Sequence, residues 1–166
     1  VGPTGHGKST TLATLVDIVN SERSDHIITI EDPIEYIFTP NKSFIDQREV
    51  GEDTPDFSTG LRDIFREDLD VIMIGEIRDG TTAETAIHAS LTGRLLLSTL
   101  HANSSVGTIA RLLDMKIDPA LVAYALNGVV AQRLVRRTCQ ICKEPYTPDP
   151  HTLDLLGLSA TGIEFI

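Results

Sequence analysis

The stretch Gly2–Ser9 has the residue types and spacing of a phosphate-binding loop, G-x-x-x-x-G-K-[S/T]. Its glycines allow consecutive backbone N–H groups to turn inward and form an anion-binding concavity. The ammonium group of Lys8 can reach the β- and γ-phosphates of a nucleotide, and the hydroxyl of Ser9 can ligate Mg²⁺. A helix beginning here would place its positive N-terminal end beneath the phosphates. The alternative is a glycine-rich turn before an ordinary helix.

The phosphate-loop pattern also predicts a strand immediately before it. The sequence begins at Val1, so we expect the leading strand to lie upstream of the residues given. The candidate nucleotide-binding residues of the loop are Gly2, Pro3, Thr4, Gly5, His6, Gly7, Lys8, Ser9 and Thr10.

Carboxylates gather after a short β-branched segment at residues 27–30. Glu31, Asp32 and Glu35 follow this segment, and Pro33 ends any regular strand pairing there. In a parallel α/β sheet, ligands bind at the carboxyl ends of the strands. The acidic side chains are therefore candidates for a ligand site, and a solvated acidic turn is an equally open interpretation.

Two further apolar segments lead into side chains that can do chemistry. Residues 71–74 form a continuous apolar run typical of a buried parallel strand, and Glu76 follows one residue later. A Glu at this place, downstream of a phosphate loop, can orient the water that attacks a γ-phosphate or hold the metal through water. Residues 95–100 predict another buried strand that leads into His101. His101 can hydrogen-bond a γ-phosphate and report its loss, or it can be a structural histidine.

Helices must flank these strands. Apolar spacing and capping signals predict helices over residues 8–20, from Thr54-Pro55 to about Glu67, from a Thr81/Glu84 capping box to near Gly93, over residues 104–115, and from Asp118-Pro119 along an apolar stripe to Leu134. Residues 36–48 are predicted to be an extended excursion. Strands that alternate with helices predict an α/β domain with a largely parallel central sheet.

Cys139 and Cys142 form a C-x-x-C pair in the last part of the chain. Such a pair can be half of a tetrahedral zinc site, but two thiolates do not close one. No second pair occurs before Ile166, and His151 is a weak candidate for a third ligand. A redox role would need a thioredoxin-like context, which the sequence lacks. From Pro145 onward, prolines and glycines predict a poorly packed segment.

Composition bounds the class of protein. The 166 residues are 41% hydrophobic and the mean hydropathy is near zero, which predicts one soluble globular domain with a real core. No apolar run approaches the roughly 20 residues that a membrane span needs. A net charge of −10 argues against nonspecific nucleic-acid binding. Two cysteines do not suggest a disulfide scaffold.

These clusters, in this order, resemble the secretion ATPases that power type II secretion and type IV pilus assembly, a family of RecA-like P-loop motors. The resemblance covers residue 1 to about residue 146. Four segments carry it: Gly2–Thr11 looks like the Walker A motif, Ile30–Glu35 the Asp box, Val71–Asp79 the Walker B motif and Ser98–His101 the His box. Gln47–Gly51 and the segment from Ala131 through the C-x-x-C also match.

The resemblance implies roles for individual residues. Lys8 and Ser9 would hold the phosphates and Mg²⁺, and His101 would couple the γ-phosphate state to domain movement. Glu76 and Glu35 would position water and metal for ATP hydrolysis. Asp32 and Arg78 would join the nucleotide-binding residues, with Arg48, Arg62 and Arg78 as candidates for charge neutralisation or contacts between subunits.

The resemblance also implies an architecture and partners. Residues 1–138 would form the RecA-like ATPase domain, truncated at its N-terminus, and residues 139–166 the start of a zinc-binding subdomain. Cys139 and Cys142 would supply the first half of that site, which assembly and secretion members carry and retraction motors generally lack. We expect a homo-hexamer, cytoplasmic and held at the inner membrane by platform proteins, with no nucleic-acid partner.

Three positions depart from the family pattern. Leu69 stands where the family usually has Pro, and Arg94 stands where it usually has His, so the His box has lost one histidine. His6 takes a variable position that is commonly Ser. The function expected from the sequence is ATP hydrolysis that drives pseudopilus or pilus assembly. The alternatives are a pilus retraction motor of the same superfamily and a nucleotide-binding scaffold that does not hydrolyse.

Overall fold

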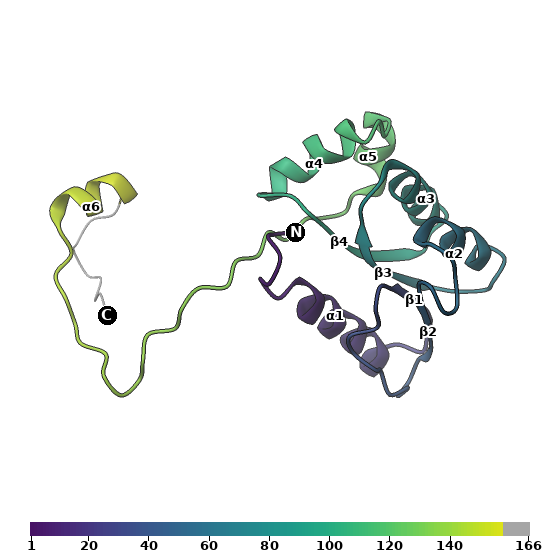
Figure 1. Ribbon diagram of the computed structural model, residues 1–166, viewed down its shortest axis with the longest axis horizontal. Coiled ribbons are helices and arrows are strands. Elements are labelled where there is room, and N and C mark those ends of the chain that lie inside the picture. Colours follow the sequence, from purple (N-terminus) through teal and green to yellow (C-terminus); the bar gives the residue numbers. More distant parts are fainter. Residues whose placement is uncertain (158–166) are drawn as a thin grey trace. The chain divides into compact units, whose positions relative to one another are not determined.

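A computed structural model describes residues 1–157 of the chain. The chain divides into two compact units, Val1–Leu134 and the residues from Val135 onward. The first unit contains the sheet and five helices, and the second contains a single short helix among the described residues (Figure 1). The residues on which the candidate site depends lie in the first unit.

The sheet of the first unit has four strands, β1 (His26–Glu31), β2 (Phe44–Glu49), β3 (Val71–Ile77) and β4 (Leu95–Leu100), in the order β2-β1-β3-β4. Every neighbouring pair is parallel, with Ile28 opposite Ile72 and Ile72 opposite Leu96. The predicted α/β class with a parallel sheet is therefore confirmed. Because parallel strands end at the same edge, the residues that follow β1, β3 and β4 meet there.

Helices cover both faces of the sheet (Figure 1). Successive residues of β1 point to opposite faces of the sheet. On one face, Ile27 packs with Leu12 and Val16 of α1 (Lys8–Glu22). On the other face, Ile28 and Ile30 pack against α2 (Phe57–Ile64) and α3 (Gly80–Leu91). Burial on both faces explains why the strands are aliphatic runs rather than alternating ones.

Two more helices close one end of the first unit. Leu112 of α4 (Ser105–Asp114) and Val122 of α5 (Pro119–Ala125) form a third apolar cluster with Ala83 of α3 and Leu100 of β4. This cluster fixes the carboxyl end of β4, which leads into His101. Within residues 1–157, no helix has both the length and the apolar character that a membrane crossing needs.

Two predicted helix starts are wrong by a few residues. The N-cap of α2 is Asp56, whose carboxylate accepts a hydrogen bond from Thr59 N at 2.8 Å, rather than Thr54. The N-cap of α3 is Asp79, which accepts from Thr82 N at 2.9 Å, and Thr81 lies inside the helix. Asp outranks Thr as a cap, so the nearest Asp begins each helix.

The Asp79 cap makes a testable contribution to stability. Hydrogen bonds from Thr82 lower the pKa of Asp79, so its stabilisation is complete above the unfolded pKa and is lost as the pH falls through the folded pKa. We expect Asp79→Ala to reduce the free energy of unfolding by about 1 kcal/mol at pH 7, measured by urea denaturation. The difference from wild type should shrink near pH 3. An equal loss at both pH values, or an equal loss in the exposed Asp17→Ala control, would contradict this role.

The predicted helix from Asp118 to Leu134 is the largest disagreement. Helix α5 ends at Ala125, and residues 126–134 belong to no helix or strand. Val1 N donates to Val130 O at 2.6 Å and Gln132 N donates to Val1 O at 2.9 Å, so this segment bonds to the start of the chain. Gly128 and the β-branched Val129 and Val130 weaken the helix locally, and the partner backbone decides the outcome.

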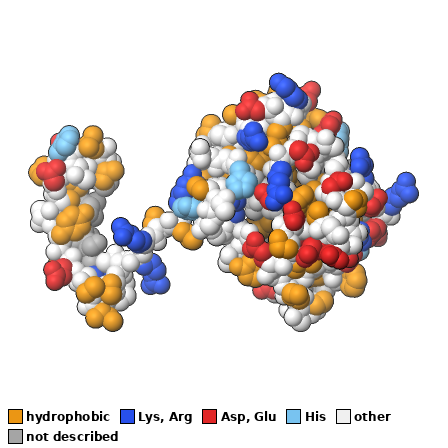
Figure 2. Space-filling view, in the orientation of Figure 1, with side chains coloured by type: hydrophobic (Ala, Val, Ile, Leu, Met, Phe, Trp, Pro, Cys, Tyr) orange, Lys and Arg blue, Asp and Glu red, His pale blue; other side chains and the backbone are white. Residues whose placement is uncertain are grey.

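The second unit is described by itself. Its helix α6 (Pro150–Leu156) has Asp149 as N-cap and Gly157 in the left-handed conformation at its C-terminal end. The prediction of a poorly packed segment from Pro145 therefore missed a short capped helix, and the rest of that segment, residues 158–166, lies outside the described residues. Acidic and basic side chains are interspersed over the visible face of the first unit (Figure 2).

Candidate functional site

The loop between Val1 and α1 has the geometry of an anion site. Gly5 and Gly7 both have a φ of 76°, a left-handed conformation that glycine adopts without strain. Gly7 is the N-cap of α1 and makes no side-chain capping bond, whereas Asp or Ser caps each of the other helices in residues 1–157. The first N–H groups of α1 therefore have no side-chain acceptor and remain available to an anion.

Lys8 is the cation of this loop. Its half-buried side chain donates from Nζ to Pro3 O at 3.0 Å, inside the loop itself. A flexible four-carbon stem lets the ammonium group exchange this carbonyl for a phosphate oxygen. Ser9 and Thr10 are exposed on the first turn of α1, and Thr10 Oγ1 lies 2.8 Å from the hydroxyl of Tyr36.

Glu76 lies at the carboxyl end of β3 between Arg78 and His101. It forms an ion pair with Arg78, and its Oε2 is 3.3 Å from His101 Nε2. The hydrogen bond from Arg78, helped by the nearby His101, lowers the pKa of Glu76 despite its partial burial. The carboxylate is therefore held ionised, as a group that orients water or metal must be.

Arg78 also joins Glu76 to the acidic loop after β1. Its Nη1 donates to Asp32 Oδ2 at 3.1 Å, and the pairing with Glu76 raises its own pKa. The family resemblance assigns Arg78 and Asp32 to nucleotide binding, and in the structure they bind each other. Glu35, the other predicted carboxylate of this loop, is exposed.

Glu31 belongs to the acidic cluster expected from the sequence but received no individual role there, although it is the most enclosed carboxylate of this edge. Glu31 is 6% exposed and accepts hydrogen bonds from Thr29 Oγ1 at 2.7 Å and Gln47 Nε2 at 3.1 Å. Its position as the last residue of β1 was the available signal, because the carboxyl end of a parallel strand faces the ligand edge.

A cavity of about 510 Å³ opens among these groups, a size typical of small-molecule sites. The predicted residues that line it are Thr4, Gly5, Gly7, Lys8, Ser9, Thr10, Asp32, Glu35, Glu76 and His101. Glu31, Tyr36 and Thr99 line it as well. Gly2, Pro3, His6 and Arg78 do not line it. The structure thus brings most of the predicted site together, although the segments are far apart in the sequence.

Comparison with known protein families matches residues 1–162 to the family described as "Type II/IV secretion system protein". The chain belongs to this family. It is 51% identical over 158 residues to "Type II secretion system protein E" of Pseudomonas aeruginosa, covering 95% of this chain and 30% of that protein. It is 48% identical over 145 residues to "Type IV pilus assembly ATPase PilB" of Myxococcus xanthus, covering 87% of this chain and 25% of that protein.

A solved structure agrees with the family assignment. The pilus retraction motor PilT with bound ADP superposes with a TM-score of 0.77 at 50% sequence identity, covering 81% of this chain and 41% of PilT. The chain therefore spans about a quarter to two fifths of the length of these relatives. The RecA-like fold expected for the secretion-protein family is thus confirmed for this part.

Leu69 and Arg94, two positions that depart from the expected family pattern, contact each other. Arg94 Nε donates to Leu69 O at 3.3 Å, and Arg94 Nη1 donates to Thr92 Oγ1 at 2.9 Å. Leu69 lies just before β3 and Arg94 just before β4, and neither residue lines the cavity. Arg94 therefore takes a structural place at the opposite edge of the sheet from His101.

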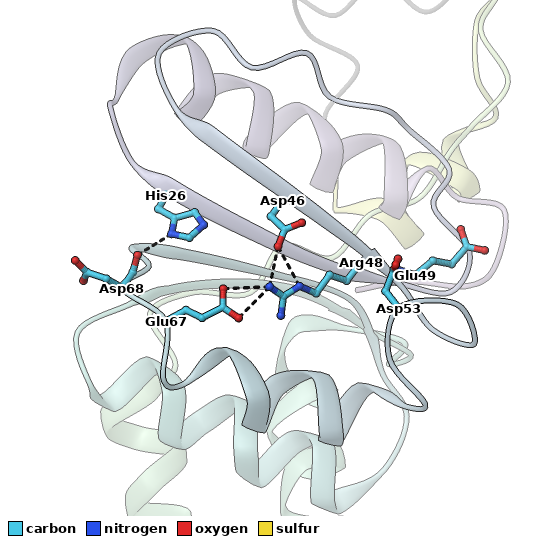
Figure 3. Close-up of polar contacts among 7 residues, drawn as sticks. All are labelled: His26, Asp46, Arg48, Glu49, Asp53, Glu67 and Asp68. Carbon is cyan, nitrogen blue, oxygen red and sulfur yellow. Dashed lines mark hydrogen bonds and ion pairs between the residues drawn. The ribbon is translucent and has the colours of Figure 1, made fainter.

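Arg48, a candidate for charge neutralisation or for a contact between subunits, is paired within the chain. Figure 3 shows its guanidinium between Asp46 of β2 and Glu67 after α2, at 2.8 and 2.9 Å. Burial opposes the charged form, but the hydrogen bonds to both carboxylates outweigh it and raise the pKa of Arg48. The same view shows His26 Nδ1 at 2.7 Å from Asp68 O, so this cluster ties β1 and β2 to the segment after α2.

The C-x-x-C of this family member is exposed. Cys139 and Cys142 are both free thiols on one turn. Hydrogen bonds from the backbone of Cys142 and Ile141 lower the pKa of Cys139, which suits a thiolate ligand. Among residues 1–157 no group of three or more His, Cys, Asp or Glu could hold a metal, so these two thiols supply at most half of a zinc site.

Proposed function

We propose that this chain is the nucleotide-hydrolysing part of a motor ATPase that drives type II secretion pseudopilus or type IV pilus assembly. The observation that carries the proposal is the shared cavity, in which the uncapped start of α1 and Lys8 face Glu76 and His101. The names of the relatives, a secretion protein E and a pilus assembly ATPase, support the same activity.

The reaction asks the protein mainly for positioning and charge stabilisation. The N–H groups at the start of α1 and Lys8 would bind the β- and γ-phosphates of ATP. Glu76, kept ionised by Arg78 and His101, would orient the attacking water, with the exposed Glu35 as a second carboxylate of the site. His101 would hydrogen-bond the γ-phosphate and sense its loss.

The residues present fit Mg²⁺, a hard cation that prefers oxygen ligands. Ser9, Asp32 and Glu76 all place oxygen-bearing side chains on the wall of the cavity. Held by these residues, Mg²⁺ would supply positive charge that offsets the negative charge developing on the phosphates. Zn²⁺ fits less well, because Cys139 and Cys142 need two further ligands.

Family resemblance extends the proposal to the assembly. We infer a homo-hexamer, cytoplasmic and docked to inner-membrane platform proteins, with no nucleic-acid partner. Because the chain spans 30% of the type II secretion protein E that it matches, activity should be tested on the full-length protein.

A pilus retraction motor is the second candidate function. The structural likeness to PilT, at 50% identity, favours it. Cys139 and Cys142 favour assembly or secretion, because that branch of the family carries the zinc subdomain. A second C-x-x-C after Ile166 in the full-length sequence would decide for assembly or secretion.

The proposal is tested by phosphate release. We expect the full-length protein to release phosphate from ATP when Mg²⁺ is present, to fall to background when EDTA removes the metal, and to recover when Mg²⁺ is added in excess. ATP binding without release above background would replace the motor with a nucleotide-binding scaffold.

A further inference from the structure

An extended segment, Val130–Leu134, lies along the phosphate loop, and we call it the strap. The side-chain amide of Gln132 bonds in both directions: Nε2 donates to His6 O at 2.8 Å, and Oε1 accepts from Thr11 Oγ1 at 2.7 Å. His6 lies before the N-cap Gly7, and Thr11 lies in the first turn of α1. One side chain thus bridges the junction between the loop and its helix.

The backbone of the strap makes further bonds to the loop. Leu134 N donates to His6 Nδ1 at 2.9 Å, and Gln132 N donates to Val1 O at 2.9 Å. Together with the Gln132 amide, these bonds fix His6 through both its carbonyl and its ring. Leu134 lines the cavity, whereas Gln132 and His6 do not. The amide of Gln132 therefore holds the middle of the loop from outside the cavity.

The strap approaches two glycines of the loop closely. A Cβ at Gly2 would lie 2.5 Å from the backbone oxygen of Gln132, closer than real Cβ atoms allow. A Cβ at Gly7 would lie 2.9 Å from Gln132 Nε2, the end of a flexible side chain that would have to move, and so would disturb the bond from Gln132 to His6. The close approach of the strap thus gives a steric reason for Gly2, and the left-handed φ of 76° gives the reason for Gly7.

The strap also reaches the loop that carries His101. Arg133 Nη2 donates to Asn103 O at 2.5 Å, two residues after His101. The phosphate loop and the His101 loop are therefore bonded to neighbouring residues of one extended segment. The segment ends at Leu134, where the first unit ends.

We propose that Gln132 is a positioning residue for nucleotide binding, acting through the phosphate loop. This inference rests on the proposed function, because it names how the same site is held ready. Gln132 does not line the 510 Å³ cavity, so it does not touch the nucleotide. Loop glycines are conformationally permissive, and an anion site of converging N–H groups loses affinity when its loop must be ordered at binding. The bidentate amide of Gln132 removes that cost.

The first test compares Gln132→Ala with Gln140→Ala in the full-length protein. Gln140 is an exposed glutamine of the second unit, and its Nε2 donates to Thr138 O at 3.4 Å. Loss of two neutral hydrogen bonds predicts that Gln132→Ala binds a fluorescent ATP analogue about tenfold more weakly. Gln140→Ala should bind it like wild type. Unchanged affinity in Gln132→Ala would overturn the inference.

A rescue pair at Thr11 separates positioning from general stability. Thr11→Val keeps the side-chain shape and loses the hydroxyl that donates to Gln132, whereas Thr11→Ser keeps that hydroxyl. We expect Thr11→Val to weaken nucleotide binding severalfold and Thr11→Ser to restore most of the affinity, with both melting near the wild-type temperature. Equal affinities for the two variants would contradict the bridge.

Hydrogen exchange measured without nucleotide tests this inference separately from the proposed function. The amides of Thr11, Gln132 and Leu134 are hydrogen-bonded, so their hydrogen exchange reports opening of the loop and strap. We expect these amides to exchange about tenfold faster in Gln132→Ala, with the amides of β1 and β3 unchanged. If the wild-type protein binds no ATP, the proposed function fails. Hydrogen exchange would still test whether Gln132 holds the loop against α1. Unchanged exchange at these amides would refute it.

Discussion

Lys8→Ala weakens ATP binding by about 10- to 100-fold, because a hydrogen bond to a charged group contributes about 1.5–3 kcal/mol. Lys8 is the cation of the phosphate loop and lines the cavity, and its Nζ donates to Pro3 O within the loop. Its loss should leave the fold intact, since this bond joins Lys8 to a carbonyl of its own loop and ties no distant elements together. Titration with a fluorescent ATP analogue measures the change.

Lys42→Ala is the matched control for this prediction. Lys42 lies on the exposed turn before β2, and its backbone N–H bonds to Asn20 O. The same charge is removed from the protein, but away from the cavity. Similar losses in both variants would point to a long-range charge effect. Wild-type affinity in Lys8→Ala would remove the phosphate loop from the proposed site.

Glu76→Gln should bind ATP with nearly wild-type affinity and hydrolyse it about 10²- to 10⁴-fold more slowly, the usual contribution of a positioned acid–base group. The change keeps the shape of the side chain and removes the charge that Arg78 and His101 face. Single-turnover phosphate release, with binding measured in parallel, separates the two effects.

Glu84→Gln provides the comparison for Glu76→Gln. Glu84 is exposed on α3, so this variant makes the same chemical change outside the cavity. Turnover should stay at the wild-type rate. Normal turnover in Glu76→Gln would mean that another carboxylate does the work, and the enclosed Glu31 would be the next to test.

The main elements of the fold could be predicted from local patterns. The strands at residues 27–30, 71–74 and 95–100 are short aliphatic runs, and each is found within a strand of the sheet. Their parallel pairing puts Glu76 and His101 at one edge, as expected. Helix starts were less predictable, because Thr54 and Thr81 compete with nearby Asp caps that differ in strength by fractions of a kcal/mol.

Pairing among the charged side chains could not be predicted from sequence. Arg78 bonds Glu76 and Asp32, two residues of the cavity wall, and Arg48 bonds Asp46 and Glu67. Each arginine had several carboxylates within reach along the chain. Only the register of the strands and the course of the loops select which of them it meets.

The sequence by itself determined the candidate site: the phosphate loop with Lys8, and Glu76 and His101 at the ends of apolar strands. Only the tertiary structure decided that residues 126–134 leave the helical pattern and that Gln132 bridges the loop. The apolar spacing there suits a helix, but local propensity is a weak preference. Hydrogen bonds to Val1, His6 and Thr11, more than a hundred residues away, outweigh it.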